Sequence, residues 1–169
     1  MPEMILLGWI HTIIAIIALI TGYYSLAIYK IIPTTRRAGQ IYLLCTFFAA
    51  VTALMIYQRG TFGPAHGLAV LTLLALAAGL MVTRISALAP IAEYFQAFCF
   101  SATLLFHMVP AITDALLRLP IGDPVLSNPE DPILKMFYLA FVVVFAVASV
   151  FQFLWLRRAR IPAPQLIDG

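Results

Sequence analysis

The chain has 169 residues and a formal net charge of +3; 63% of its residues are hydrophobic and only 10% are charged. Soluble globular domains are about 45–50% apolar and about 25% charged. So few charges would leave large apolar patches facing water, so the composition excludes a water-soluble globule. A content of 12% aromatic residues also excludes an intrinsically disordered chain, which is poor in such side chains.

Five stretches between charged residues are long enough to cross a membrane as helices. A membrane-spanning helix needs about 20 mainly apolar residues, and lipid cannot satisfy the backbone of an open sheet. We therefore predict an all-α fold, a polytopic membrane protein whose five transmembrane helices form one bundle and one transmembrane domain over residues 1–169. The predicted spans are residues 4–29, 38–58, 60–83, 91–117 and 133–156. The first predicted span lacks the basic residues that precede the apolar part of a signal peptide, so we expect it to be a transmembrane helix and not a signal peptide.

The longest segment between predicted spans is residues 118–132, RLPIGDPVLSNPEDP. Its four prolines oppose helix formation, because proline has no backbone N–H to donate. The Gly-Asp-Pro and Asn-Pro sequences are typical of turns. We expect an ordered loop on the outer face of the membrane.

Lysine and arginine residues are distributed unevenly between the two sides of the predicted bundle. Seven would lie on one side: Lys30, Arg36, Arg37, Arg84, Arg157, Arg158 and Arg160. Three would lie on the other: Arg59, Arg118 and Lys135. Basic loops favour the cytoplasm, so we predict a multi-pass protein of a bacterial inner membrane with its N-terminus outside and its C-terminus in the cytoplasm. This asymmetry explains the basic character of the chain, so no nucleic-acid partner is expected.

Small residues indicate which helix faces pack against protein, because they let helices approach closely in lipid. The first three spans each hold a pair of small residues four positions apart: Ala18/Gly22, Ala49/Ala53 and Ala75/Gly79. In the first span one helical stripe contains His11, Ala15, Ala18, Gly22 and Ser25. We therefore expect His11 to face the bundle interior.

The fourth span carries a polar stripe made of Gln96, Cys99, Thr103, His107, Pro110 and Asp114. Polar side chains in a membrane helix are costly unless they face protein or water. Pro110 deprives the Phe106 carbonyl of its helical donor, and a kink there would open room beside His107. The alternative is an ordinary proline kink, with Thr103 bonded to its own backbone.

The three histidines are the candidate ligands of a cofactor site. His11 and His107 would lie in the outer half of the bundle, where facing imidazoles hold haem b axially or bind a divalent metal ion; His66 is a third candidate. Thr103, Pro110, Asp114 and Gln96 complete the predicted pocket. For each histidine the alternative role is structural, as a hydrogen-bond partner of a neighbouring helix. For Asp114 the alternatives are an ion pair with Arg118 and a proton or cation acceptor above His107.

Three segments resemble those of a family of small bacterial predicted membrane proteins without an assigned function. The segments are Trp9-Ile10-His11, Arg36-Arg37-Ala38-Gly39-Gln40-Ile41-Tyr42 and Gly60-Thr61-Phe62-Gly63-Pro64-Ala65-His66. The resemblance covers about half the chain and implies a membrane fold but no activity. The chain departs from the family pattern at Thr35, where the family has a histidine, and no histidine begins the fourth span.

Three classes of function remain open. The first is an outward-facing, histidine-containing pocket that binds haem or a metal ion and is linked to redox chemistry. The second is a non-enzymatic accessory or structural subunit that packs against another membrane protein or a second copy of itself. The third is a conduit for protons or small solutes. The sequence contains no HExxH, CxxC, CxxCH or Walker motif, so whether the protein is an enzyme stays open.

Overall fold

The computed structural model describes residues 6–56 and 62–159. Five α-helices follow one another: α1 (Leu6–Tyr29), α2 (Arg37–Met55), α3 (Pro64–Met81), α4 (Ala92–Arg118) and α5 (Pro132–Ala159). Two short 3₁₀ turns, Val82–Arg84 and Ser86–Leu88, connect α3 to α4. The described ranges contain no β-strand, and all five helices are long and apolar enough to cross a membrane. The predicted all-α fold with five transmembrane helices is confirmed.

Local sequence accounts for several helix ends. Pro64 stands in the first turn of α3 directly after Gly63, a position where the missing N–H of proline costs nothing. Helix α1 ends before Lys30, which has a left-handed backbone conformation (φ 66°). The Lys30 amide still donates a hydrogen bond to the Leu26 carbonyl. The predicted boundaries at residues 4, 58 and 60, together with Arg59 and Arg160, lie outside the described residues.

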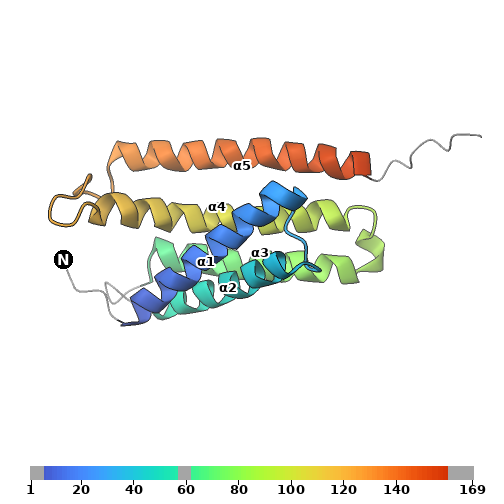
Figure 1. Cartoon of the computed structure of the whole chain (residues 1–169), viewed down its shortest axis with the longest axis horizontal. Helices are drawn as coiled ribbons and strands as arrows, with labels where there is room; N and C mark the ends of the chain where they lie inside the picture. The colour runs from blue at the N-terminus through green and yellow to red at the C-terminus, as the bar shows by residue number, and fades with distance from the viewer. Residues whose placement is uncertain (1–5, 57–61, 160–169) are drawn as a thin grey trace, which may run out of the picture.

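Helix α4 occupies the centre of the arrangement and contacts α1, α3 and α5, while α1 packs mainly on α2. In Figure 1 α1 crosses obliquely over α2 and α4, and α5 lies alongside α4 at the edge of the bundle. The segment between α4 and α5 contains no helix. It folds back on the end of α4, where the Leu126 amide donates to the Leu116 carbonyl at 2.9 Å.

Two glycines allow the helices to approach closely. A Cβ atom added at Gly22 of α1 would lie 2.8 Å from the ring of Tyr42 and 2.9 Å from Leu104. A Cβ atom at Gly79 of α3 would lie 2.6 Å from the ring of Phe100. The small-residue faces around these glycines therefore pack inside this chain, and they supply no argument for a partner protein.

The predicted inward stripe of α1 is also the buried one, since the buried residues of this helix are Ala18, Gly22 and Ser25. Between α1, α2, α3 and α4 lies an apolar core centred on fully buried Tyr42 and Phe100. This core separates the two ends of the bundle, and polar groups collect on either side of it.

Candidate functional site

The imidazole of His11 turns from α1 toward α2. Its Nδ1 lies 3.0 Å from the Ala49 carbonyl oxygen and 3.0 Å from the Thr52 hydroxyl. A carbonyl oxygen only accepts hydrogen bonds, so Nδ1 carries the proton and donates it. In the neutral imidazole, Nε2 is then the nitrogen with a free lone pair.

The imidazole of His107 reaches the same helix from α4. Its Nε2 lies 3.2 Å from the Thr46 hydroxyl. Thr46 and Ala49 are three residues apart, which is about 4.5 Å along a helix. The two histidines therefore bind neighbouring turns on one face of α2.

Below these contacts lies a fully buried pair of hydroxyl groups, Tyr42 on α2 and Thr103 on α4. The Tyr42 hydroxyl bonds Thr103 Oγ1 and also lies 3.2 Å from the Phe100 carbonyl oxygen. Thr46 lies one helical turn from Tyr42 on the same face of α2. His107 thus bonds Thr46, and one turn further along α2 Tyr42 bonds Thr103.

We call this set the polar row. Its members are His11 on α1, Tyr42, Thr46 and Thr52 on α2, and Thr103 and His107 on α4. From Tyr42 to Thr52 the row follows α2 for about 15 Å, which is half of a hydrocarbon layer about 30 Å thick. Such an internal path of polar groups is unusual in a membrane domain, where they are retained mainly where they pair or function.

The remaining predicted pocket residues of α4 do not all join the histidines. The Thr103 hydroxyl donates to the Phe100 carbonyl at 2.7 Å, so Thr103 bonds its own backbone and Tyr42; neither contact orients His107. Helix α4 continues through Pro110. Gln96 lies about 16 Å along the helix from His107 and donates to the Gly79 carbonyl at 2.7 Å.

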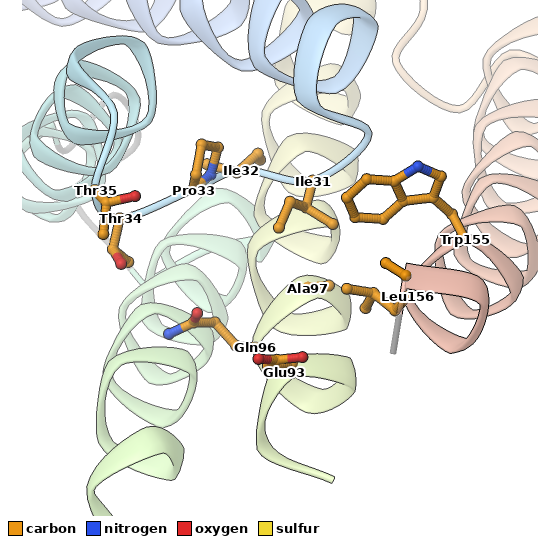
Figure 2. Close-up of a pocket in the computed structure, with 11 residues that line it drawn as sticks. Ile31, Ile32, Pro33, Thr34, Thr35, Glu93, Gln96, Ala97, Trp155 and Leu156 are labelled. Carbon is orange, nitrogen blue, oxygen red and sulfur yellow. The ribbon is translucent and has the colours of Figure 1, made fainter. Parts of the chain in front are cut away.

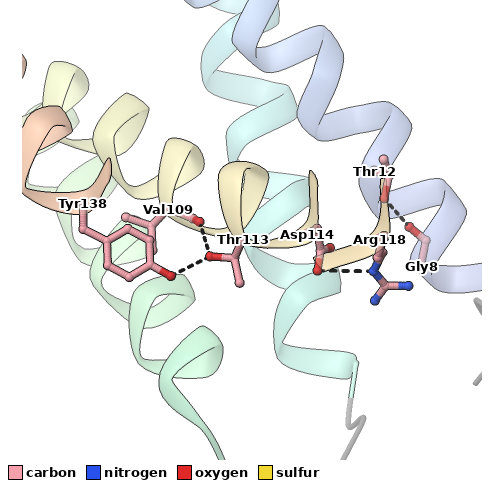
Figure 3. A network of polar contacts seen from close by, with 7 residues as sticks. All are labelled: Gly8, Thr12, Val109, Thr113, Asp114, Arg118 and Tyr138. Carbon is pink, nitrogen blue, oxygen red and sulfur yellow. Dashed lines mark hydrogen bonds and ion pairs between the residues drawn. The ribbon is translucent and has the colours of Figure 1, made fainter. Parts of the chain in front are cut away.

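Asp114 lies near the C-terminal end of α4 and pairs with Arg118, with Arg118 Nε 3.4 Å from Asp114 Oδ1. The ion pair predicted as one alternative for Asp114 is therefore present. Figure 3 shows this ion pair beside the start of α1, where the Thr12 hydroxyl donates to the Gly8 carbonyl. On the other side of α4, the Thr113 hydroxyl is hydrogen-bonded to the Tyr138 hydroxyl of α5.

His66 occupies a different place, in the first turn of α3. Its Nδ1 accepts a hydrogen bond of 3.1 Å from the Gly63 amide, and its ring stacks on Phe62 with centroids 5.0 Å apart. The imidazole thus satisfies an amide at the helix start, as glutamate or glutamine does in a capping box. This is the structural role expected as the alternative for His66.

Three members of the polar row, Tyr42, Thr46 and Thr52, are not among the residues predicted from the sequence. They lie at spacings of four and six residues, with Ala49 between the last two, and so share one stripe of α2. The helical repeat that reveals the stripes of α1 and α4 also identifies this one. The small-residue pair Ala49/Ala53 of this span indicates a packing face but does not by itself point to the hydroxyl groups beside it.

A second polar connection, also absent from the predictions, ties α5 to the rest of the bundle. Gln152 of α5 is buried; its Oε1 accepts from the Ser101 hydroxyl at 2.9 Å, and its Nε2 donates to the Lys30 carbonyl at 2.9 Å. Both polar atoms of the amide are therefore satisfied inside the membrane domain. One side chain joins the edge helix to α4 and to the end of α1.

A cavity of about 410 Å³ lies at the opposite end of the bundle from the histidines. It is lined by residues 31–35 of the α1–α2 connection, the beginning of α4 and the end of α5, and it is open on one side. Figure 2 shows Trp155 extending over it toward Ile31, with Glu93 and Gln96 on α4. Among the described residues, no histidine lines this cavity or the shallow hollow on α5 around Val150.

The described residues contain no group of three or more histidine, cysteine or acidic side chains arranged to hold a metal ion. A haem between His11 and His107 would need both rings to aim a nitrogen into one large opening. Each ring bonds α2 through one nitrogen, and neither cavity described above is lined by a histidine. The described residues therefore give no support for a haem between these two histidines.

Comparison of the chain with family profiles, with curated proteins and with solved structures finds no match. The assignment of function consequently depends on the geometry of the polar row and of the cavity.

Proposed function

We propose that this chain is a multi-pass protein of a bacterial inner membrane, related to the small membrane proteins that it resembles over its first half. Five apolar helices support membrane insertion. The orientation rests on the basic residues, which favour a cytoplasmic location for the end of the bundle that carries Arg36, Arg37, Arg157 and Arg158. In this orientation the histidine end faces outward.

Within that membrane domain we propose that the polar row accepts protons from the outer face and forms the outer half of a proton conduit. The observation that carries this proposal is a pair of hydrogen bonds on one face of α2, His107–Thr46 and Tyr42–Thr103, whose α2 residues lie one helical turn apart. Each member has a hydrogen to donate and a lone pair to accept one, as proton transfer along a chain requires. Rows of histidine and acidic side chains in membrane proteins serve as proton relays.

The two ends of the row support a direction of entry. Asp114 is exposed at the rim of α4, beside the start of α1, the helix that carries His11. Past Thr103 the path meets the apolar core, where Phe100 is fully buried. The proposed conduit therefore also includes water or a rearrangement at this core, which carries the proton past it.

The test is proton flux into proteoliposomes that contain a trapped pH dye and are driven by a potassium diffusion potential. Identical replacements His11→Gln, His107→Gln and His66→Gln form a matched series, because glutamine can still accept the Gly63 amide at the start of α3. We expect about a tenfold loss of flux for the first two variants and less than a twofold change for His66→Gln. Equal flux in wild type and His107→Gln, or flux no greater than in protein-free vesicles, would overturn the proposal.

A metal ion bound by His11 and His107 is the second candidate function. Its specific support is the bond from His11 Nδ1 to the Ala49 carbonyl, since metal-bound histidines commonly donate their other nitrogen to a carbonyl oxygen and so fix the ring. Titration of the purified protein with Zn²⁺ and Cu²⁺ tests it. Binding of one equivalent that is lost in both His11→Gln and His107→Gln would favour a metal site over a proton relay.

A further inference from the structure

The cavity at the basic end lies close to the inner end of the polar row. Helix α4 contributes to both, because Gln96 lines the cavity and Thr103 belongs to the polar row. Seven residues separate Gln96 from Thr103, which is about 10 Å along a helix. A hydrocarbon layer is about 30 Å thick, so the gap between the two polar regions is about a third of it.

The cavity has the size and the lining that water requires. Its volume is about 410 Å³, and one molecule of liquid water takes about 30 Å³, so there is room for on the order of ten molecules. Thr34, Thr35, Glu93 and Gln96 contribute polar side chains to the lining, and an enclosed water molecule needs about two to four polar partners. The cavity is also open on one side, so water inside it exchanges with the solution at the basic end.

The apolar core separates this cavity from the polar row. Ile32, which is 2% exposed, lines the cavity and belongs to the same core as Phe100. Phe100 is fully buried and lies on α4 between Gln96 and Thr103, about one turn from each. The Phe100 side chain therefore stands where the two polar regions come nearest on this helix.

The ring of Phe100 packs directly on the backbone of α3. A Cβ atom at Gly79 would lie 2.6 Å from this ring, so the glycine is what lets the ring come so close. The Gly79 carbonyl in turn accepts the hydrogen bond of 2.7 Å from Gln96 Nε2, and Figure 2 shows this amide beside the cavity. The polar lining of the cavity and the closed apolar contact thus meet at Gly79. Apolar constrictions of this kind close membrane pathways by excluding water.

We propose that the cavity is the water-filled cytoplasmic end of the proton conduit and that the Phe100 ring is the barrier between this water and the polar row. The inference rests on the proposed function of the row. When the ring is displaced, the Thr103 hydroxyl gives its hydrogen to water beside Gln96 and receives one from the Tyr42 hydroxyl, which is reprotonated from the outer part of the row. With the ring in place the two polar regions stay apart, and the chain does not leak protons continuously.

Thiol labelling tests the cavity and the barrier without any measurement of proton flux. Gln96→Cys and Thr103→Cys are made separately in a background with Cys45→Ala and Cys99→Ala. A membrane-impermeant methanethiosulfonate is applied to the face from which Ser86→Cys reacts, since Ser86 is exposed in the α3–α4 connection at this end. We expect Gln96→Cys to react about tenfold faster than Thr103→Cys. Adding Phe100→Ala should raise the rate for Thr103→Cys about tenfold.

Proton flux in the liposome assay is the second readout. Phe100→Ala should raise flux about fivefold, and Phe100→Leu, which keeps a large apolar side chain in the core, about twofold. Phe95→Ala is the matched control and should change neither readout, because Phe95 lies on the same helix but is 43% exposed. Adding His107→Gln to Phe100→Ala should lower the flux again, since the protons still pass through the polar row.

Equal labelling rates for Gln96→Cys and Thr103→Cys with Phe100 in place would overturn the proposal, and this comparison needs no change in the core. So would a labelling rate for Thr103→Cys that neither Phe100→Ala nor Phe100→Leu alters. The proposed function can fail separately: if His107→Gln conducts protons as wild type does while Phe100→Ala still exposes Thr103→Cys, the row is not the proton path but Phe100 is the barrier to water.

Discussion

The Nε2 atom of His107 lies 3.2 Å from the Thr46 hydroxyl, and this contact joins the polar stripes of α4 and α2 in the interior of the bundle. Thr46 is fully buried, so its hydroxyl has no water as an alternative partner. Replacing Thr46 with valine keeps the shape of the side chain and removes the hydroxyl. We expect thermal unfolding in detergent to show a loss of about 0.6 kcal/mol, the average measured for hydrogen bonds between membrane helices, and at most about 1.7 kcal/mol.

Thr83→Val is the control for this substitution, because Thr83 is exposed and bonds the Leu80 carbonyl close to it in the chain. It should change stability by less than about 0.5 kcal/mol. Equal losses in the two variants would show that the contact with His107 contributes nothing.

Gly39, in the first turn of α2, is the glycine at which a Cβ atom would have the least space. A Cβ atom there would lie 1.9 Å from the Pro33 carbonyl oxygen, so Gly39→Ala forces the backbone of the α1–α2 connection to move. We expect a loss of about 1–3 kcal/mol or more from this overpacking, measured by thermal unfolding. Gly67→Ala in α3 meets nothing within 4 Å and should be neutral or stabilise the protein by up to about 1 kcal/mol. The prediction is wrong if Gly39→Ala unfolds at the wild-type temperature.

Gln152 links α5 to Ser101 and to the Lys30 carbonyl. In Gln152→Leu the Lys30 carbonyl and the Ser101 hydroxyl lose this partner, and we expect about 1 kcal/mol of destabilisation. A double-mutant cycle with Ser101→Ala isolates the contact between the two side chains. A coupling free energy of about 0.6 kcal/mol is expected; strict additivity would argue against a direct bond.

The ion pair between Asp114 and Arg118 should contribute little to stability. The Asp114 side chain is 62% exposed, and exposed pairs spaced by four residues on a helix contribute about 0.3–0.5 kcal/mol. Asp114→Asn is therefore expected to leave the unfolding temperature nearly unchanged. If the same variant slows proton uptake in the liposome assay, Asp114 acts in entry of protons to the polar row; a large loss of stability would instead assign it a structural role.

The orientation in the membrane is tested by single cysteines at Ser127 and Ser86 in a background with Cys45→Ala and Cys99→Ala. Both serines are exposed, and they lie in connections at opposite ends of the bundle. A membrane-impermeant thiol reagent applied to intact cells should label position 127 and spare position 86. The reverse pattern would place the histidine end in the cytoplasm and require protons to enter the polar row from that side.

The sequence by itself determined the class of fold and the inward faces of two helices. Uncharged stretches of about 20 residues must form helices in lipid, since only a helix satisfies the hydrogen bonds of its backbone within the same segment. The stripes through His11 and His107 follow from the helical repeat of 3.6 residues. Both are local properties, so one sequence was enough to predict them.

Only the tertiary structure decided which side chains meet. Spacing predicted that His11 and His107 face inward, but it could not show that each binds α2, because the rotation and tilt of one helix against another depend on how all the side chains pack. The spacing likewise could not show that Gln96 lies away from the histidines, since it gives the face of the helix on which a residue lies and not the residue that it contacts. Thr46 and Tyr42 join the site only because close packing at Gly22 and Gly79 brings α1 to α4 together. Trp155 and Glu93 line one cavity only because α5 packs against α4.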